Sequence, residues 1–291
     1  MAANPSSPSV MPADAAPVAP PPLRLAPLPA LAGHGRIDVL GCHLDSVDMS
    51  DAVAACERSI KSRQYLQHMS VNVAKLVSLK DDPQLRAAVE ACGLVTGDGQ
   101  GVVWASRVLG QPIPERVAGI DLMLQLLELS AERGYRPYIL GAKQEVLELA
   151  VDKLGSQFPG LELAGWRNGY FSDDEVGAVC RDIRESKADI LFVAMSSPRK
   201  EYFLGDHGLG LAVPFTMGVG GSIDVVAGIT KRAPRWMQRH GLEWLFRTLQ
   251  EPRRLARRYL VTNVRFAGML ARELLSRKLS RSRPRRGPAA S

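Results

Sequence analysis

The sequence has few cysteines and no long apolar run. Its four cysteines, Cys42, Cys56, Cys92 and Cys180, are scattered through 291 residues, and no two of them form a Cys-x-x-Cys pair. This spacing indicates neither a zinc site nor a disulfide framework, and it is typical of a protein from the reducing cytoplasm. A membrane-spanning helix needs about 20 mostly apolar residues. Prolines interrupt the apolar stretches near the N-terminus and arginines interrupt those near the C-terminus, so no such helix is predicted.

Common nucleotide-binding signatures are also absent. The glycine-rich segment Gly218-Val-Gly-Gly-Ser222 is not followed by Gly-Lys-Ser/Thr, which excludes a P-loop, and it lacks the Gly-x-Gly-x-x-Gly of a dinucleotide site. The segment is either a phosphate site built from backbone N–H groups at a helix start or a tight strand-to-helix turn. No Asp-x-Asp pair is present to hold a metal beside a nucleotide sugar. We therefore expect no divalent metal and no other cofactor.

Charge is distributed unevenly along the chain. The net charge is +7, yet the residues from Thr230 onward hold 17 Lys/Arg and three acids, whereas the preceding residues hold 20 Lys/Arg and 27 acids. A mildly acidic body therefore carries a strongly basic C-terminal region. Such a region predicts an anionic partner, either a membrane surface, a nucleic acid or a phosphate ligand.

The composition divides the chain into four segments. Nine of the 20 prolines fall within the first 30 residues, so residues 1–33 are predicted to be a leader without regular structure, and not a signal peptide. Residues 34–230 are predicted to form an α/β catalytic domain. Residues 231–279 are predicted to be a basic helical appendage, and residues 280–291 a basic tail without regular structure.

Short apolar runs alternate with helical patterns along the body. A strand pair is predicted within residues 36–47. The strands expected after it are Tyr65–Val71, Leu94–Thr96, Pro137–Leu140, Leu161–Ala164, Ile190–Met195 and Val213–Met217. Strands that alternate with helices at this spacing indicate βαβ units. The predicted fold is therefore α/β and Rossmann-like, with a mostly parallel sheet flanked by helices and a basic helical C-terminal appendage.

The segment Leu94-Val-Thr-Gly-Asp-Gly99 is the most informative single stretch. Asp98 stands between two glycines at the carboxyl end of a predicted strand, where open α/β sheets bind ligands. An Asp in this setting is also a common turn residue that bonds its own backbone. Further polar or glycine-rich positions follow other strands and are expected to gather at the same crevice: Ser70, Asn72, Arg116, Gly141, Ser196–Glu201 and Gly218–Asp224.

Several of these residues have a structural interpretation beside the functional one. Ser70 and Asn72 either orient a substrate or cap the following helix. Lys200 either contacts phosphates or lies on a solvated helix face. Glu201 and Asp224 are either second acids at the site or, respectively, a salt-bridge partner and a first-turn acid favoured by the helix dipole.

Seven motifs together resemble one family. They are Ser-x-Asn at 70–72, Gly-Asp-Gly at 97–99, Glu-Arg-Val-x-Gly-x-Asp at 115–121, Pro-Arg-Lys-Glu at 198–201, Gly-Val-Gly-Gly-Ser-Ile-Asp at 218–224, Arg-Ala-Pro-x-Trp at 232–236 and Gly-Leu-Glu-Trp-Leu-x-Arg at 241–247. In order and spacing they are similar to the WecG/TagA/CpsF glycosyltransferases, which make cell-envelope polysaccharides. The resemblance covers roughly residues 36–272.

The resemblance implies a reaction and a set of partners. It implies inverting transfer of a sugar from a UDP-sugar to a sugar on a polyprenyl diphosphate, with Asp98 as the general base. A carboxylate on the acceptor hydroxyl can take its proton, while arginines stabilise the departing diphosphate. We therefore assign Asp98, Asn72 and Arg116 as catalytic. The expected substrate-binding residues are Ser70, Gly99, Asp121, Gly141, Pro198, Lys200, Gly220, Gly221, Ser222, Asp224, Arg247, Arg254 and Arg257.

The basic appendage has two interpretations. Leu, Val, Phe and Met alternate with arginines from Arg254 to Leu279, so the helix either lies on an anionic membrane or docks on its own body with a solvated basic face. The first interpretation places the protein peripherally at the inner face of the cell membrane. No helix-turn-helix or RNA-recognition pattern occurs, which disfavours nucleic acid. The sequence leaves a homo-oligomer open.

Two departures from the family's usual motifs bear on the function. Ser70 stands where the family often has Thr and keeps the hydroxyl, whereas Lys200 replaces a frequent Gln with a charge. Because Lys200 departs from the family motif, we do not infer the identity of the donor sugar from the resemblance. An alternative function is a non-catalytic component of an envelope-assembly complex that binds nucleotide sugars.

Overall fold

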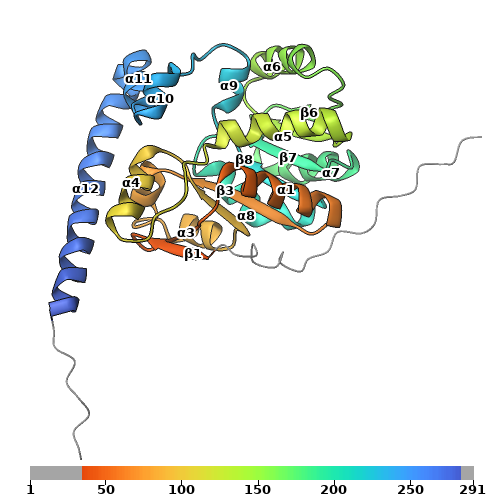
Figure 1. Cartoon of the computed structure of the whole chain (residues 1–291). Coiled ribbons are helices and arrows are strands. Elements are labelled where there is room, and N and C mark those ends of the chain that lie inside the picture. The colour runs from red at the N-terminus through yellow and green to blue at the C-terminus, as the bar shows by residue number, and fades with distance from the viewer. Residues whose placement is uncertain (1–34, 283–291) are drawn as a thin grey trace, which may run out of the picture.

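The computed structural model describes residues 35–282, in which a six-stranded parallel sheet lies between helical layers (Figure 1). The strand order is β4-β3-β8-β7-β5-β6, and every neighbouring pair is parallel. The strands of this sheet are β3 (Leu66–Val71), β4 (Leu94–Gly97), β5 (Pro137–Gly141), β6 (Gly165–Arg167), β7 (Ile190–Ala194) and β8 (Phe215–Gly218). The predicted α/β fold class is confirmed.

A separate antiparallel hairpin precedes the sheet. Its strands are β1 (Arg36–Val39) and β2 (Cys42–Asp45), as predicted within residues 36–47. The two turn residues, Leu40 and Gly41, have φ values of 59° and 82°. Positive φ at both positions is what a two-residue hairpin turn needs to match the strand twist.

Helices connect the strands and continue beyond the last of them. They are α1 (Met49–Ser62), α2 (Val73–Ser78), α3 (Pro83–Glu90), α4 (Gln100–Val108), α5 (Gly119–Arg133), α6 (Gln144–Gln157), α7 (Val176–Glu185), α8 (Arg199–His207), α9 (Ser222–Val226), α10 (Arg235–Arg239), α11 (Glu243–Gln250) and α12 (Pro252–Ser282). Short 3-10 turns, η1 (Asp173–Glu175) and η2 (Gly208–Leu211), flank α7 and α8. Among these described helices, none is long and apolar enough to cross a membrane.

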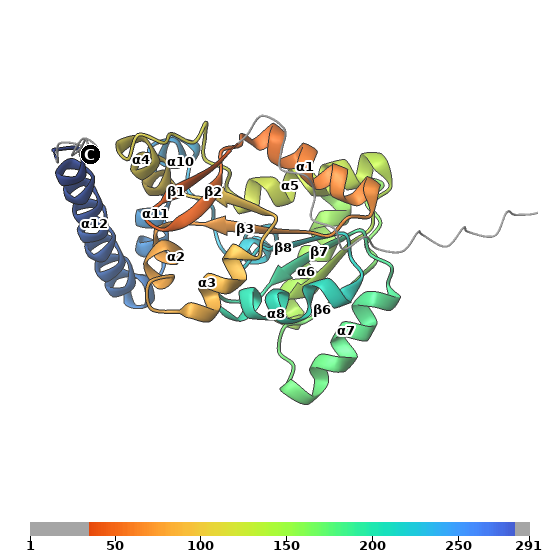
Figure 2. The same cartoon turned by 90° about the horizontal axis from the view of Figure 1, so that it is seen from below.

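Side chains that alternate along the central strands build a core on each face of the sheet. Ile139 and Phe192 point into one core with α1, α5, α6 and α9, whereas their neighbours Leu140 and Val193 point into the other with α7 and α8. Figure 2 shows α1 and α5 on one side of the strands and α7 and α8 on the other. Because both faces are covered, the strands are nearly continuous apolar runs, as buried parallel strands require.

The strand predicted at Leu161–Ala164 is wrong. The strand in this region is β6, which begins at Gly165 and pairs with Tyr138–Leu140 of β5. Leu161 and Leu163 instead pack against the core from the connection before it. A Cβ at Gly165 would lie 2.8 Å from the Tyr138 ring, so the glycine lets the strand approach where a larger residue would not.

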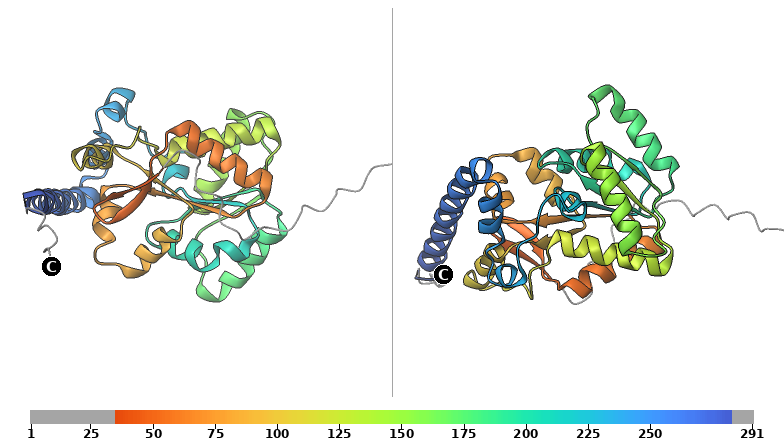
Figure 3. Two further views of the ribbon diagram at one scale, coloured as in Figure 1. Left: turned by 60° about the horizontal axis from the view of Figure 1, so that its bottom comes forward. Right: turned by 90° about the horizontal axis from the view of Figure 1, so that it is seen from above.

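The C-terminal helix α12 docks on the body along one stripe. Phe266, Met269, Leu270 and Leu274 pack against the core cluster of the β1–β2 hairpin and α2–α4, and α12 contacts α2 directly. Figure 3 shows α12 at the edge of the molecule, beside α11. Through this stripe the basic appendage docks on its own body, which is one of its two interpretations. The predicted leader, residues 1–33, lies outside the described residues. The tail without regular structure is predicted from residue 280, but α12 continues to Ser282, and the rest of the tail lies outside the described residues.

Gly141 is a position where only glycine fits. Its φ is +134°, and a Cβ there would lie 2.4 Å from the carbonyl of Ala194 on the neighbouring strand. Gly155, on an exposed part of α6, has nothing within 4 Å of such an atom and has ordinary helical geometry.

We expect Gly141→Ala to lower the free energy of unfolding by about 2 kcal/mol or more, because the new methyl group meets backbone and the φ is strained. Gly155→Ala should raise it by about 0.5–1 kcal/mol, because alanine favours a helix. Urea denaturation of both variants measures the difference. Equal stabilities would contradict the backbone geometry at Gly141.

Candidate functional site

The carboxyl end of β3 contributes Ser70 and Asn72. The Ser70 hydroxyl oxygen is buried and has no hydrogen-bond partner within residues 35–282. Asn72 is the N-cap of α2, and its Oδ1 accepts a 3.0 Å hydrogen bond from the N–H of Lys75. Asn72 therefore caps the helix that follows it, as one of its two interpretations predicts. Ser70 does not cap a helix, and its hydroxyl lies without a partner among the described residues, beside the N-terminus of α5. A Cβ at Gly119 would lie 2.8 Å from that hydroxyl.

Asp98 follows β4 and lies next to the same strand end. Its N–H donates to the carbonyl of Val71 at 2.8 Å, which joins the ends of β3 and β4. Gly99 has a φ of +101°, a conformation that L side chains rarely adopt. The Asp98 carboxylate accepts a long hydrogen bond, 3.5 Å, from the N–H of Gly119. The side chain therefore points across the strand ends towards α5 and not back onto its own turn.

The surroundings of Asp98 favour its protonated form. Burial raises the pKa of this carboxyl; Arg116 and Arg247 oppose the shift, and the negative charge of Glu243 adds to it. The net pKa is above its usual value of 3.8. A carboxylate with a raised pKa is a stronger base than an ordinary aspartate, which suits proton abstraction from a hydroxyl.

Arg116 lies on the loop between α4 and α5, close to Asp98. The N–H of Val117 donates to the carbonyl of Gly97 at 3.0 Å, which fixes this loop against the end of β4. The Arg116 guanidinium donates through Nη1 to Glu243 Oε2, and its Nη2 lies 3.8 Å from Asp121 Oδ2.

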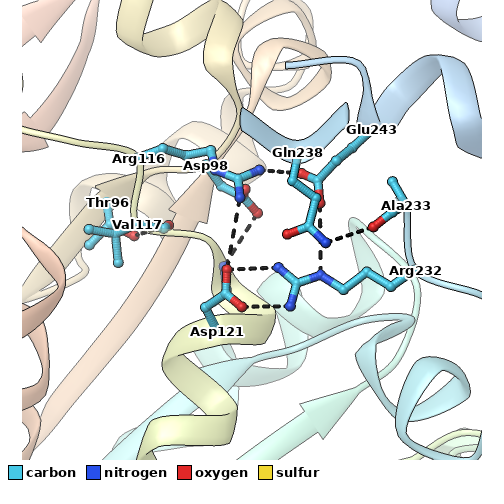
Figure 4. A network of polar contacts seen from close by, with 10 residues as sticks. Thr96, Asp98, Arg116, Val117, Asp121, Arg232, Ala233, Gln238 and Glu243 are labelled. Carbon is cyan, nitrogen blue, oxygen red and sulfur yellow. Dashed lines mark hydrogen bonds and ion pairs between the residues drawn. The ribbon is translucent and has the colours of Figure 1, made fainter. Parts of the chain in front are cut away.

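Residues from the C-terminal segment complete this network (Figure 4). Arg232 forms a two-pronged ion pair with Asp121, with Nη1–Oδ1 at 2.6 Å and Nη2–Oδ2 at 2.8 Å. Its Nε lies 3.9 Å from Glu243 Oε1. Sequence reasoning did not assign Arg232 or Glu243 to the site, although both stand in motifs that carry the resemblance, at 232–236 and 241–247. We name Arg116, Asp121, Arg232 and Glu243 the ion-pair network.

A second charged cluster lies inside the protein beside the site. Lys75 Nζ and Lys200 Nζ are each 2.8 Å from Glu201 Oε1, and all three side chains are buried. Burial raises the pKa of Glu201, but the two ammonium groups outweigh this effect and hold the pKa at about 2. Burial lowers the pKa of Lys200 to about 8, although Glu201 opposes the shift. The solvated-face interpretation of Lys200 is therefore wrong, and the salt-bridge interpretation of Glu201 is confirmed.

Lys200 lies under the glycine-rich turn after β8. A Cβ at Gly218 would lie 2.9 Å from Lys200 Cδ, and one at Gly220, where φ is +54°, would lie 4.0 Å from Lys200 Nζ. The Ser222 hydroxyl donates to the carbonyl of Val219 at 2.8 Å, and Asp224 stands in the first turn of α9. Since β8 pairs with β3, this turn adjoins the strand end that carries Ser70.

The other predicted site residues are spread more widely. Gly141 ends β5 and is separated from β3 by β7 and β8, so it does not join Asp98. Pro198 is the exposed N-cap of α8 and follows a cis peptide bond. Arg247 on α11 is exposed yet close enough to act on the Asp98 pKa, and Arg257 is exposed on α12. The side chain of Arg254 lies outside the described part of the structure.

Comparison with known proteins identifies the family. The model of the glycosyl transferase WecG/TagA/CpsF family matches residues 37–280, which is most of the chain. The chain belongs to this family. It is therefore a glycosyltransferase, and the match includes the ion-pair network and nearly all of α12.

Two relatives share one named activity. A protein of Bacillus spizizenii is 34% identical over 176 residues, which cover 60% of this chain and 68% of the relative. A protein of Bacillus subtilis is 34% identical over 169 residues, which cover 58% of this chain and 65% of the relative. Both are named N-acetylglucosaminyldiphosphoundecaprenol N-acetyl-β-D-mannosaminyltransferase. These relatives transfer an N-acetylhexosamine to a sugar on a lipid diphosphate.

Replacing Asp98 tests both its chemistry and its energetic cost. We expect Asp98→Asn to lower kcat by about 100-fold or more, because the amide cannot accept a proton. The same change should raise Tm at pH 7. A carboxyl whose folded pKa is raised stabilises the fold while it is protonated, and that contribution is lost as the pH rises through the folded pKa.

The gain in Tm should therefore shrink below the ordinary carboxyl pKa of 3.8, where Asp98 is protonated in folded and unfolded chains alike. Thermal melts at several pH values, together with the rate assay, measure both effects. A variant that is fully active, or less stable than the parent at pH 7, would contradict this account of Asp98.

Proposed function

We propose that the chain is an inverting glycosyltransferase that moves a sugar from a UDP-sugar to a polyprenyl-diphosphate-linked sugar, in the synthesis of an exopolysaccharide or another envelope glycopolymer. The observation that carries the proposal is the position of Asp98. Its carboxylate stands at the joined ends of β3 and β4, has a raised pKa and lies close enough to Arg116 for that guanidinium to oppose the shift.

These residues divide the chemistry between them. Asp98 takes the proton of the acceptor hydroxyl as that oxygen attacks the anomeric carbon from the face opposite the leaving group. The bond from the anomeric carbon to the diphosphate breaks, and negative charge grows on the departing oxygen. Arg116 stabilises that charge, since a guanidinium matches phosphate oxygens with parallel N–H donors. The unused hydroxyl of Ser70 is left to orient a sugar or phosphate group.

Cations of the chain take the place of a metal in this proposal. Arg116 and Arg232 lie near Asp98, and Arg247 acts on its pKa from α11. Charge stabilisation of a leaving phosphate by arginines has the same electrostatic basis as stabilisation by a divalent ion. We propose that transfer does not depend on a divalent metal.

One assay tests the proposed reaction. The full chain is incubated with a panel of UDP-sugars and with undecaprenyl-diphosphate N-acetylglucosamine, the acceptor class in the names of the relatives, and the lipid product is identified by mass. We expect one added N-acetylhexosamine, with the anomeric configuration inverted, and equal yields with and without EDTA. Binding of UDP-sugar without transfer to any lipid acceptor would favour a non-catalytic component instead.

The outward face of α12 supports a place at the membrane. Leu260, Val261, Val264 and Leu275 recur at helical spacing and are exposed, on the face away from the docked stripe. Exposed arginines at 257, 258, 265 and 272 accompany them. An apolar face accompanied by cations binds the interface of an anionic bilayer. We propose that the enzyme associates peripherally with the inner face of the cell membrane through this surface, where its lipid-linked acceptor resides.

Point variants test this surface more sharply than a truncation does. We expect Leu260→Glu with Val264→Glu to weaken binding to vesicles that contain anionic lipid by about tenfold or more, since two apolar contacts become charged. The matched control is Leu209→Glu, because Leu209 is also exposed but lies on η2. Vesicle co-sedimentation measures the binding. Equal binding by the double variant and the control would contradict this membrane surface.

A further inference from the structure

Glu243 occupies a position between two arginines that come from different parts of the chain. Its Oε2 accepts from Nη1 of Arg116 on the body, and its Oε1 lies 3.9 Å from Nε of Arg232. Arg116, Arg232 and Glu243 are all partly buried. The carboxylate of α11 therefore fills an anion position beside Asp98 that the rest of the site creates (Figure 4).

The donors at this position are only partly used. Arg232 directs Nη1 and Nη2 to Asp121, but its Nε is buried and has no hydrogen-bond partner among the described residues. Arg116 is paired with Glu243 through Nη1, whereas its Nη2 is 3.8 Å from the nearest carboxylate oxygen. An anion with more oxygens and more charge than one carboxylate would satisfy these N–H groups better.

We propose that the Glu243 carboxylate occupies the position that the diphosphate of the donor takes when it binds. The carboxylate and the diphosphate then compete for Arg116 and Arg232. This inference rests on the proposed function, because it takes the ligand to be a nucleoside diphosphate. When the donor binds, its phosphates displace the Glu243 carboxylate. The two-pronged pair between Asp121 and Arg232 does not involve Glu243 and keeps the C-terminal segment on the body.

Because Glu243 belongs to α11, this competition couples donor binding to the position of the C-terminal helices. In the absence of donor, Glu243 pairs with Arg116, while Arg232 remains paired with Asp121. With donor bound, α11 loses the Glu243 contacts to Arg116 and Arg232, and the C-terminal segment is freer to adjust to the lipid-linked acceptor. Donor affinity is reduced by the free energy needed to break the contact with Glu243, as for any ligand that competes with a built-in partner.

The experiment is calorimetric titration of UDP and of inorganic pyrophosphate into four full-length proteins: the parent, Glu243→Gln, Glu243→Asp and Asp81→Asn. Asp81→Asn is the matched control, because it also removes one acid and one ion pair between the body and the C-terminal segment. Its partner is Arg265 at 2.6 Å on α12, and Asp81 is not among the site residues.

We expect Glu243→Gln to lower the Kd for both ligands by about three- to tenfold, which corresponds to losing one competing ion pair. Glu243→Asp keeps the charge and the fold but shortens the reach of the carboxylate, so it should lower Kd by a smaller factor. Asp81→Asn should bind like the parent.

The outcomes separate this inference from the proposed function. If UDP binds the parent but Glu243→Gln and Glu243→Asp bind it equally or more weakly, Glu243 is a supporting residue and the inference is wrong while the donor class stands. If Asp81→Asn tightens binding as much as Glu243→Gln, loosening of the segment is the cause and the competition is refuted. If no protein binds UDP or pyrophosphate, both the donor class and the inference are wrong.

Discussion

The ion pairs that join the C-terminal segment to the body are the constraint on which the site depends. Asp121 and Arg116 come from the loop and helix after β4, whereas Arg232 and Glu243 come from residues beyond the last strand. Without these contacts Arg232 and Glu243 would not be held beside Arg116 and Asp98. They also bring Glu243 and Arg247 close enough to act on the pKa of Asp98. The pKa of Asp98 is thus tied to a segment more than 100 residues away in the sequence.

Most of the fold follows from local patterns that the sequence displays. Buried parallel strands such as β7 are nearly continuous apolar runs, and helix starts such as Asp48 and Asp82 carry capping acids. The failure at β6 has a physical reason. Leu161 and Leu163 are apolar because they pack in a connection against the core, whereas the edge strand itself, Gly165–Arg167, is short, and its glycine is needed for close approach to Tyr138. Three residues at a sheet edge leave little pattern in a sequence.

The sequence predicted which candidate site residues gather at strand ends. It did not predict the residues that come together from distant segments. Ser70, Asp98 and Arg116 gather because neighbouring parallel strands end at one edge, a rule that needs no side-chain detail. Lys75 and Glu243 were missed because their roles come from pairing across elements. Lys75 meets Glu201 inside the protein, and Glu243 of α11 meets Arg116 of the loop before α5. The charge introduced by Lys200 is likewise understood only with its neighbours, since Lys200 shares the Glu201 carboxylate with Lys75 under the Gly218–Gly220 turn.

A charge swap between Asp121 and Arg232 tests most directly whether the ion-pair network holds the site together. Asp121→Arg and Arg232→Asp each place like charges side by side, whereas the double variant restores an opposite pair in reversed orientation. Comparison of kcat/KM for the four proteins isolates the pairwise contribution. The account predicts that each single variant loses about tenfold or more and that the double variant recovers most of that loss. Full activity in either single variant, or a double variant no better than the worse single one, would contradict it.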